Sequence, residues 1–595
     1  MASNIVRSSA PIEGANINTA ARSSYWTAGL FLFCSWVLFA NLGGAPLFEP
    51  DEGRNAEVAR EVLLLGDWVT PHYDFIPRLD KPMLYFDLVA LSFKAFGISE
   101  WSARLPGILA ALGCILLTYL FARRFFGRWA ALWSGLILLT SFEFFGLARD
   151  VMLDTLLLFF VTSALYCFFL GQQQAERGMG RTPFLLMYAA MAAGTVTKGP
   201  IGFLLPAAII FFYILFEKRW VLLRSMAFPL GIPLFTVIAL PWYLLAELRN
   251  PGYLQYFLWE ENLVRFTTTH FHRSEPWYFF ILVLVGGFFP WSILLPSATR
   301  YLWKRSITCE RLFLVLWMMV PLIVFSLSSA KLAHYILPIF PAVAIMVGAL
   351  IGNAAVPEPA VRRVLWFPPM GFFLLALAST LVAAWPRLLP DHLQTYVHRA
   401  FPESPAIIFA GLALSLICIV ASVRRRHEHG PFVLATAATF AVLAFVAQPI
   451  IATVASNRSS KVLVEQAAPL IRDGDQVAQF GGYPSSLPFY LGSQRPIAVI
   501  LRGEKHSILG SEYVALKRPA SAPGYGKALY TVQEFNELWK SSENRIVIFV
   551  DKGAMRHLHE LTGDAPAPRT LLEIGDLVLV ENRPVSEGDS SNSGL

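Results

Sequence analysis

The stretch WTAGLFLFCSWVLFANLGGAPLFEPDEGR, residues 26–54, joins a long apolar run directly to a dense polar segment. Residues 26–45 carry no charge and are long enough, as a helix, to cross a hydrocarbon core of ~30 Å. Where an ordinary loop would leave the bilayer, the chain instead reads Glu49-Pro50-Asp51-Glu52-Gly53-Arg54, and Asp80-Lys81-Pro82 follows. Acids and bases concentrated beside the first span predict a reactive loop in a membrane-embedded enzyme.

The composition supports a membrane protein over the whole length. Of 595 residues, 55% are hydrophobic and only 15% are charged, and the mean hydropathy is +0.52. A soluble protein would carry about 25% charged residues. The apolar runs lie near residues 26–45, 104–122, 129–147, 151–170, 184–197, 201–216, 226–247, 278–299, 311–328, 334–351, 366–385, 405–422 and 431–454. They predict a polytopic α-helical membrane protein with about 13 transmembrane helices.

One further apolar segment, residues 83–97, is short and contains Asp87 and Lys94. The positive-inside rule decides its placement. If residues 83–97 do not cross the membrane, every second loop is basic and lies on the same side as the N-terminus. The basic residues of these loops are Arg123/Arg124/Arg128, Arg177/Arg181, Lys218/Arg219/Arg224, Arg300/Lys304/Arg305/Arg311, Arg362/Arg363 and Arg424/Arg425/Arg426. We therefore predict an interfacial helix at 83–97, a cytoplasmic N-terminus at 1–25 and a membrane domain at 26–454 with an exoplasmic catalytic loop at 46–103.

The loops with unusual polar residues are predicted to lie on the opposite, exoplasmic side of the membrane. These are the Asp51 loop, Arg149-Asp150, Lys198-Gly199-Pro200, residues 247–277 and residues 328–335. Their convergence on one face predicts a site there. Residues 51–66 read as an amphipathic helix that Asp51 caps and Gly66 ends, lying on the membrane with its apolar side down.

Residues 455–583 have the composition of a soluble α/β domain outside the membrane. Strands are expected at 476–483, 496–502, 545–551 and 571–581, and helices at 531–540 and 554–562. The polar tail 584–595 is expected to be disordered. The five cysteines show no paired spacing, and there is no nucleotide-binding motif and no basic–aromatic pattern for nucleic acid.

An ordered set of motifs over residues 26–350 resembles the GT-C glycosyltransferases related to protein O-mannosyltransferases. The closest branch is that of the bacterial aminoarabinose transferases, which modify lipid A. The matching segments are 50–57, 66–71, 80–82, 149–154, 197–200, 261–266 and 331–338. The resemblance implies a GT-C fold and transfer of a sugar, such as 4-amino-4-deoxy-L-arabinose, from a polyprenyl-phosphate donor to lipid A or another envelope acceptor. It also implies a monomer in the bacterial inner membrane with a periplasmic active site.

The resemblance assigns roles to residues of these motifs. Asp51 is expected beside the anomeric carbon, as a general base or as a group that positions the acceptor; the alternative is a helix cap. Lys81 is expected to face the donor phosphate, and the alternative is a lysine that reaches the headgroups. Asp154 is expected in the catalytic network, because a charge at membrane depth needs a partner or a wet cavity. The other substrate-binding candidates are Arg54, Lys198, Arg265, Lys331 and Tyr335.

Two alternatives remain open at this point. A divalent metal, zinc, would need Asp80 and Glu261 with His270 or His272, although related proteins often carry glutamate where this chain has Asp80. A transporter of a lipid-linked substrate would also place charges in the membrane, but transporters usually hold them near the midplane in repeated halves, and no repeat is visible here. The acceptor, which the sequence does not name, could also be a protein or a polysaccharide.

Overall fold

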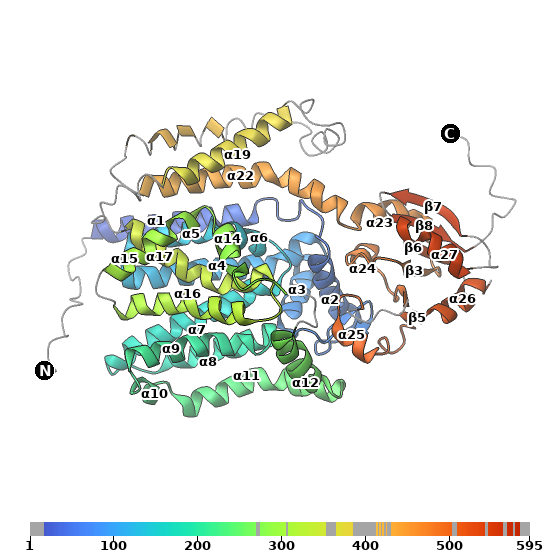
Figure 1. Ribbon diagram of the computed structural model, residues 1–595, viewed down its shortest axis with the longest axis horizontal. Helices are drawn as coiled ribbons and strands as arrows, with labels where there is room; N and C mark the ends of the chain where they lie inside the picture. The colour runs from blue at the N-terminus through green and yellow to red at the C-terminus, as the bar shows by residue number, and fades with distance from the viewer. Residues whose placement is uncertain are drawn as a thin grey trace.

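A computed structural model describes residues 17–268, 274–304, 308–352, 365–384, 430–501, 508–541, 545–562, 568–574 and 577–582, together with parts of 412–424. Long helices lie side by side in a bundle, and a smaller domain built around a sheet adjoins one end of it (Figure 1). The beginning of α1 lies at the opposite end of the bundle from that domain. The predicted tail and residues His270 and His272 fall outside the described residues.

The bundle consists of apolar helices in the order that the hydropathy predicts. They are α1 (Ile17–Phe39), α4 (Glu100–Phe126), α5 (Arg128–Leu139), α6 (Phe142–Ala148), α7 (Leu153–Glu176), α8 (Thr182–Lys198), α9 (Ile201–Glu217), α11 (Phe228–Arg249), α14 (Phe279–Gly287), α15 (Leu295–Lys304), α16 (Cys309–Leu327), α17 (Phe340–Gly352), α19 (Phe367–Ala384) and α22 (Gly430–Asn457). Within the described residues, six helices, or eight counting bent pairs, are long and apolar enough to span a membrane. Helices occupy every predicted run except 405–422, most of which lies outside the described residues.

Two of the candidate spans in the described residues are broken by a sharp bend. Helices α5 and α6 meet at an angle of 67°, and α14 meets the helical segment from Trp291 at 110°. Pro290 precedes that second bend, where a missing backbone N–H favours a break. The Trp291 indole donates to the Thr140 hydroxyl at 2.8 Å, so the two breaks are joined to each other. Both bends are therefore fixed features of the packed core.

The polar loop after α1 forms helices α2 (Asp51–Leu65) and α3 (Leu84–Phe96). Gly66 ends α2 in the left-handed region at φ 67°, as predicted. The prediction that Asp51 caps α2 is wrong, because Pro50 occupies the cap position and no side chain caps the helix. Residues 52–62, except Arg54, are buried, so α2 also cannot lie on a membrane with an exposed polar face.

The C-terminal domain contains a six-stranded sheet in the order β5-β4-β3-β6-β8-β7. The strands are β3 (Gln476–Phe480), β4 (Ala498–Leu501), β5 (Leu529–Thr531), β6 (Ile546–Asp551), β7 (Arg569–Ile574) and β8 (Leu577–Glu581). The first four are parallel, and the hairpin β7–β8 adds antiparallel to β6. Helices α26 (Val532–Lys540) and α27 (Met555–Thr562) also match the sequence prediction; β5 was not foreseen.

This domain covers α2 and the strand-like segment that follows it. The Arg60 guanidinium donates to the Ser493 carbonyl at 2.7 Å, and the Ile497 amide donates to the buried Asp74 carboxylate at 2.8 Å. The Tyr73 hydroxyl donates to the Ser485 carbonyl at 2.9 Å. Helix α2 is thus enclosed between the bundle and the sheet domain, which explains the burial of its polar face.

Candidate active site

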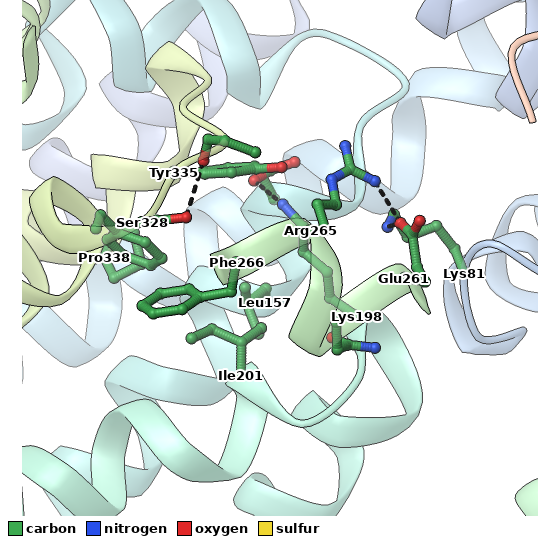
Figure 2. Close-up of a pocket in the computed structure, with 14 residues that line it drawn as sticks. Lys81, Leu157, Lys198, Ile201, Glu261, Arg265, Phe266, Ser328, Tyr335 and Pro338 are labelled. Atoms are coloured by element: carbon green, nitrogen blue, oxygen red, sulfur yellow. Dashed lines mark hydrogen bonds and ion pairs between the residues drawn. The ribbon is translucent and has the colours of Figure 1, made fainter. Parts of the chain in front are cut away.

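A pocket of about 130 Å³ opens where α7, α8, η1 (Tyr256–Val264) and η3 (Ala333–Ile339) meet. Figure 2 shows Glu261 with Lys81 and Arg265 on one side of it, and Ser328, Tyr335 and Pro338 on the other. Six residues that the sequence singled out line this pocket: Lys81, Asp154, Lys198, Glu261, Arg265 and Tyr335. The structure therefore brings side chains from five separate segments of chain together at one pocket.

Three cations of the pocket share two carboxylates. The Lys81 ammonium lies 2.5 Å from Glu261, and Arg265 pairs with the same carboxylate. Lys198 pairs with Asp154 and also lies 5.0 Å from the centre of the Tyr335 ring. If each group carries its ordinary charge, one positive charge is left over. Groups so deeply buried are costly unless they are paired or bind a charged ligand, and the surplus charge makes an anion the expected ligand.

The remaining wall of the pocket is apolar and continues toward the outside of the bundle. Leu157, Ile201, Phe266, Phe325 and Pro338 line it. The η1 segment and the short α13 (Arg265–Thr267) turn Glu261 inward, whereas Leu258, Trp259, Leu263 and Phe266 lie between 39% and 58% exposed on its outer side. Exposed aromatic and aliphatic side chains suit contact with lipid. The pocket thus combines a cationic end with an apolar wall.

Asp51 and Arg54 pair with each other and do not line this pocket. The side chain of Asp51 is 47% exposed. Burial and the neighbouring Arg54 lower the pKa of Arg78, while Asp80, Glu261 and Asp51 act in the opposite direction. Arg78 is therefore within electrostatic reach of both Asp51 and the pocket carboxylate. Asp51 itself lies outside the pocket, at the start of α2, where loops of the C-terminal domain contact Gly53 and Arg54.

The donor set around Asp80 does not fit a metal. Its Oδ1 accepts from the Tyr256 hydroxyl at 2.7 Å, and Arg78 lies 3.4 Å from its Oδ2. Burial raises its pKa, but Arg78 and the surrounding hydrogen bonds outweigh burial and hold the pKa below the usual range. Glu261 is held by two cations. Among the described residues no three His, Cys, Asp or Glu side chains come together as a metal site. Asp80 and Glu261 are therefore not assigned as zinc ligands.

Other charged residues of the loops have structural roles. Glu52, with both oxygens facing Arg104 at 2.7–2.9 Å, also accepts from the amides of Phe48 and Val151. Arg149 donates to the carbonyls of Leu38 and Ala40 at 2.8 and 2.9 Å, at the end of α1. Lys331, predicted to bind substrate, is buried but does not line the pocket.

Several contributors were missed by sequence reasoning. His334, whose Nε2 is 3.9 Å from Asp154, lies inside a motif that the resemblance had marked. Arg78 stands two positions before Asp80, a local signal that could have been used. Tyr256 and Tyr513, which both hydrogen-bond Asp80, come from distant parts of the chain and gave no signal.

Comparison with known proteins agrees with this architecture. The family model for dolichyl-phosphate-mannose-protein mannosyltransferase matches residues 52–257. The undecaprenyl phosphate-α-4-amino-4-deoxy-L-arabinose arabinosyl transferase of Aeromonas salmonicida is 31% identical over 408 residues, which cover 67% of this chain and 73% of that protein. The protein of the same name from Pseudomonas aeruginosa is 31% identical over 60% of this chain and 65% of its own length.

A solved structure matches over nearly the whole length. The crystal structure of ArnT from Cupriavidus metallidurans bound to undecaprenyl phosphate has a TM-score of 0.78 and 25% identity, covering 94% of this chain and 98% of that one. The bundle, the charged pocket and the appended sheet domain define a multi-pass membrane glycosyltransferase of the GT-C fold. Within that class, the chain belongs to the undecaprenyl phosphate-α-4-amino-4-deoxy-L-arabinose arabinosyl transferase family.

Proposed function

We propose that this protein transfers 4-amino-4-deoxy-L-arabinose from undecaprenyl phosphate to lipid A at the periplasmic face of the bacterial inner membrane. The observation that carries the proposal is the pocket in which Lys81, Lys198 and Arg265 oppose only two carboxylates beside an apolar wall. A polyprenyl-phosphate sugar has one phosphodiester charge and a long hydrocarbon chain, so it matches both ends of this pocket. The relative from Cupriavidus metallidurans is described as bound to undecaprenyl phosphate.

The charge balance of the pocket favours departure of the sugar. As the bond between the anomeric carbon and the phosphate oxygen breaks, the phosphate gains negative charge. Fixed cations interact more strongly with the charge that develops than with the bound donor, and this difference lowers the barrier. Asp154, paired with Lys198, and Glu261, placed between Lys81 and Arg265, hold the cations in position.

Asp51 supplies the acceptor side of the reaction in this proposal. The carboxylate is half-exposed and pairs with Arg54, and its charge acts on Arg78 together with that of the pocket residue Glu261. An attacking hydroxyl would give its proton to Asp51, whereas a lipid A phosphate is already anionic and would need orientation by Arg54 instead. Attack from the side opposite the phosphate gives a product with inverted configuration at the anomeric carbon.

Reconstitution tests the proposal. The purified protein in proteoliposomes receives undecaprenyl phosphate-aminoarabinose and lipid A, and the lipid A is analysed by mass spectrometry. We expect addition of one pentosamine per modified phosphate, dependent on the protein and abolished in Lys198→Met. An unmodified lipid A spectrum with an active donor would contradict the proposal. Transfer to added protein or polysaccharide in the same vesicles would identify a different acceptor.

A further inference from the structure

The C-terminal domain is hydrogen-bonded to Glu49, two residues before Asp51. The Glu49 carboxylate accepts from the backbone amides of Ser485 at 2.6 Å and Ser486 at 2.7 Å, and from the Ser486 hydroxyl. These serines lie in the loop between β3 and α24 (Leu487–Leu491). Hydrogen bonds to an ionised carboxylate are among the stronger kinds. This contact therefore joins the start of α2 firmly to the sheet domain.

The same loop also touches the first turn of α2 directly. A Cβ added at Gly53 would lie 2.6–2.7 Å from the Cβ, Cα and amide nitrogen of Ser486. Such distances are below any ordinary contact, so the helix and the loop touch backbone to backbone. No side chain can stand at position 53 without moving Asp51 or the domain.

A second part of the domain contacts the partner of Asp51. Gly510, at φ 69°, packs so closely against Arg54 that an added Cβ would meet its guanidinium. The Arg78 guanidinium donates to the Gly510 carbonyl at 3.5 Å. Two loops of the C-terminal domain, 485–486 and the one that contains Gly510, thus contact the first turn of α2 at Gly53 and at Arg54, the partner of Asp51.

We propose that Glu49 is a positioning residue, through which the 485–486 loop of the C-terminal domain fixes Asp51 and Arg54 beside the donor pocket. The sheet domain then completes the active site without contributing a reacting group. This inference rests on the proposed transfer reaction at Asp51. A displacement of about 1 Å at a reacting group costs on the order of 10²-fold in rate, so the contact acts on turnover.

The test compares two carboxylates at the same domain interface. Glu49→Gln keeps the size of the side chain but loses the charge and places an amide group against backbone N–H donors. Glu100→Gln removes a carboxylate of α4 that contacts Lys461 at 2.7 Å and Tyr490 at 3.2 Å. It leaves the bonds between Glu49 and the 485–486 loop in place. With the full-length protein in proteoliposomes, we expect kcat to fall on the order of 10²-fold in Glu49→Gln and less than about threefold in Glu100→Gln, with the KM for the donor unchanged in both.

The outcomes separate this inference from the proposed function. Absence of transfer by the wild-type protein would defeat the proposed function itself. Active wild-type protein with equal kcat in the two variants would show that Glu49 only tethers the domain, and would overturn the inference. If Glu49→Gln fails to accumulate in membranes, Ser486→Ala decides. It removes the hydroxyl bond to Glu49, together with the bond that this hydroxyl accepts from the Ser460 amide, and leaves the two backbone amides on Glu49 in place. We expect a several-fold lower kcat at unchanged KM, and an unchanged kcat would refute the positioning role.

Discussion

Replacement of Lys81 by Met tests the charge balance of the donor pocket. The Lys81 ammonium lies 2.5 Å from Glu261 and its side chain is 25% exposed. Without it, two cations face two carboxylates, and the surplus positive charge disappears. At an effective dielectric of about 20, a unit charge about 4 Å from the phosphate is worth roughly 4 kcal/mol. Partial exposure reduces this to about 2–3 kcal/mol, which corresponds to a loss of about 30- to 150-fold in kcat/KM.

The assay is transfer of labelled aminoarabinose from undecaprenyl phosphate to lipid A in proteoliposomes. Lys461→Met is the matched control, because Lys461 also pairs with a glutamate, at 2.7 Å, but away from the pocket. The double variant Lys81→Met/Glu261→Gln restores the surplus of one positive charge and should recover part of the lost activity. Wild-type activity in Lys81→Met would refute the role of Lys81. Activity of the double variant below that of Lys81→Met would refute the charge balance.

Three further changes test other parts of the structure. Asp51→Asn should abolish transfer while undecaprenyl phosphate still raises the unfolding temperature; full activity would end the catalytic assignment. Burial raises the pKa of Asp74 well above its usual range despite the bond from Ile497, so stability should fall as pH rises above the usual Asp pKa of about 4. Asp74→Asn should flatten that pH dependence of the unfolding temperature, and an unchanged slope would contradict this. Gly202→Ala would place Cβ 2.2 Å from the backbone of Gly194, and should lower the free energy of unfolding by about 1–3 kcal/mol; undiminished thermal stability would show that the helices can separate freely.

The bundle and the sheet could be predicted because both follow from local patterns. Apolar runs gave the helices, and the turn at Gly66 was visible from its residue type. The motifs that resemble the GT-C family gave Lys81, Lys198 and Arg265, and the three side chains meet because like-sided loops of a bundle lie at one end of it. The burial of α2 could not be predicted, because its polar face is covered by segments more than 400 positions away in sequence, such as Ser493.

The expectations of a helix cap at Asp51 and of metal ligands at Asp80 and Glu261 rested on residue type. Asp51 had the residue type and position of a helix cap, but Pro50 takes that place. Asp80 and Glu261 had the residue types of metal ligands, but Arg78, Lys81 and Arg265 neutralise them in three dimensions. Residue type alone does not reveal which partner a carboxylate finds.

The enclosure of α2 also has a consequence for how the enzyme is made. Glu49 and its partner Ser486 are 437 positions apart. The loop that contains Glu49 and Asp51 is therefore synthesised long before the 485–486 loop that binds Glu49. Until the last strands are synthesised and folded, Asp74 has no amide to bond and the polar face of α2 meets water. We expect a nascent or truncated chain to bind the undecaprenyl-phosphate donor without transferring the sugar. Activity would then begin only once the C-terminal domain has folded against α2.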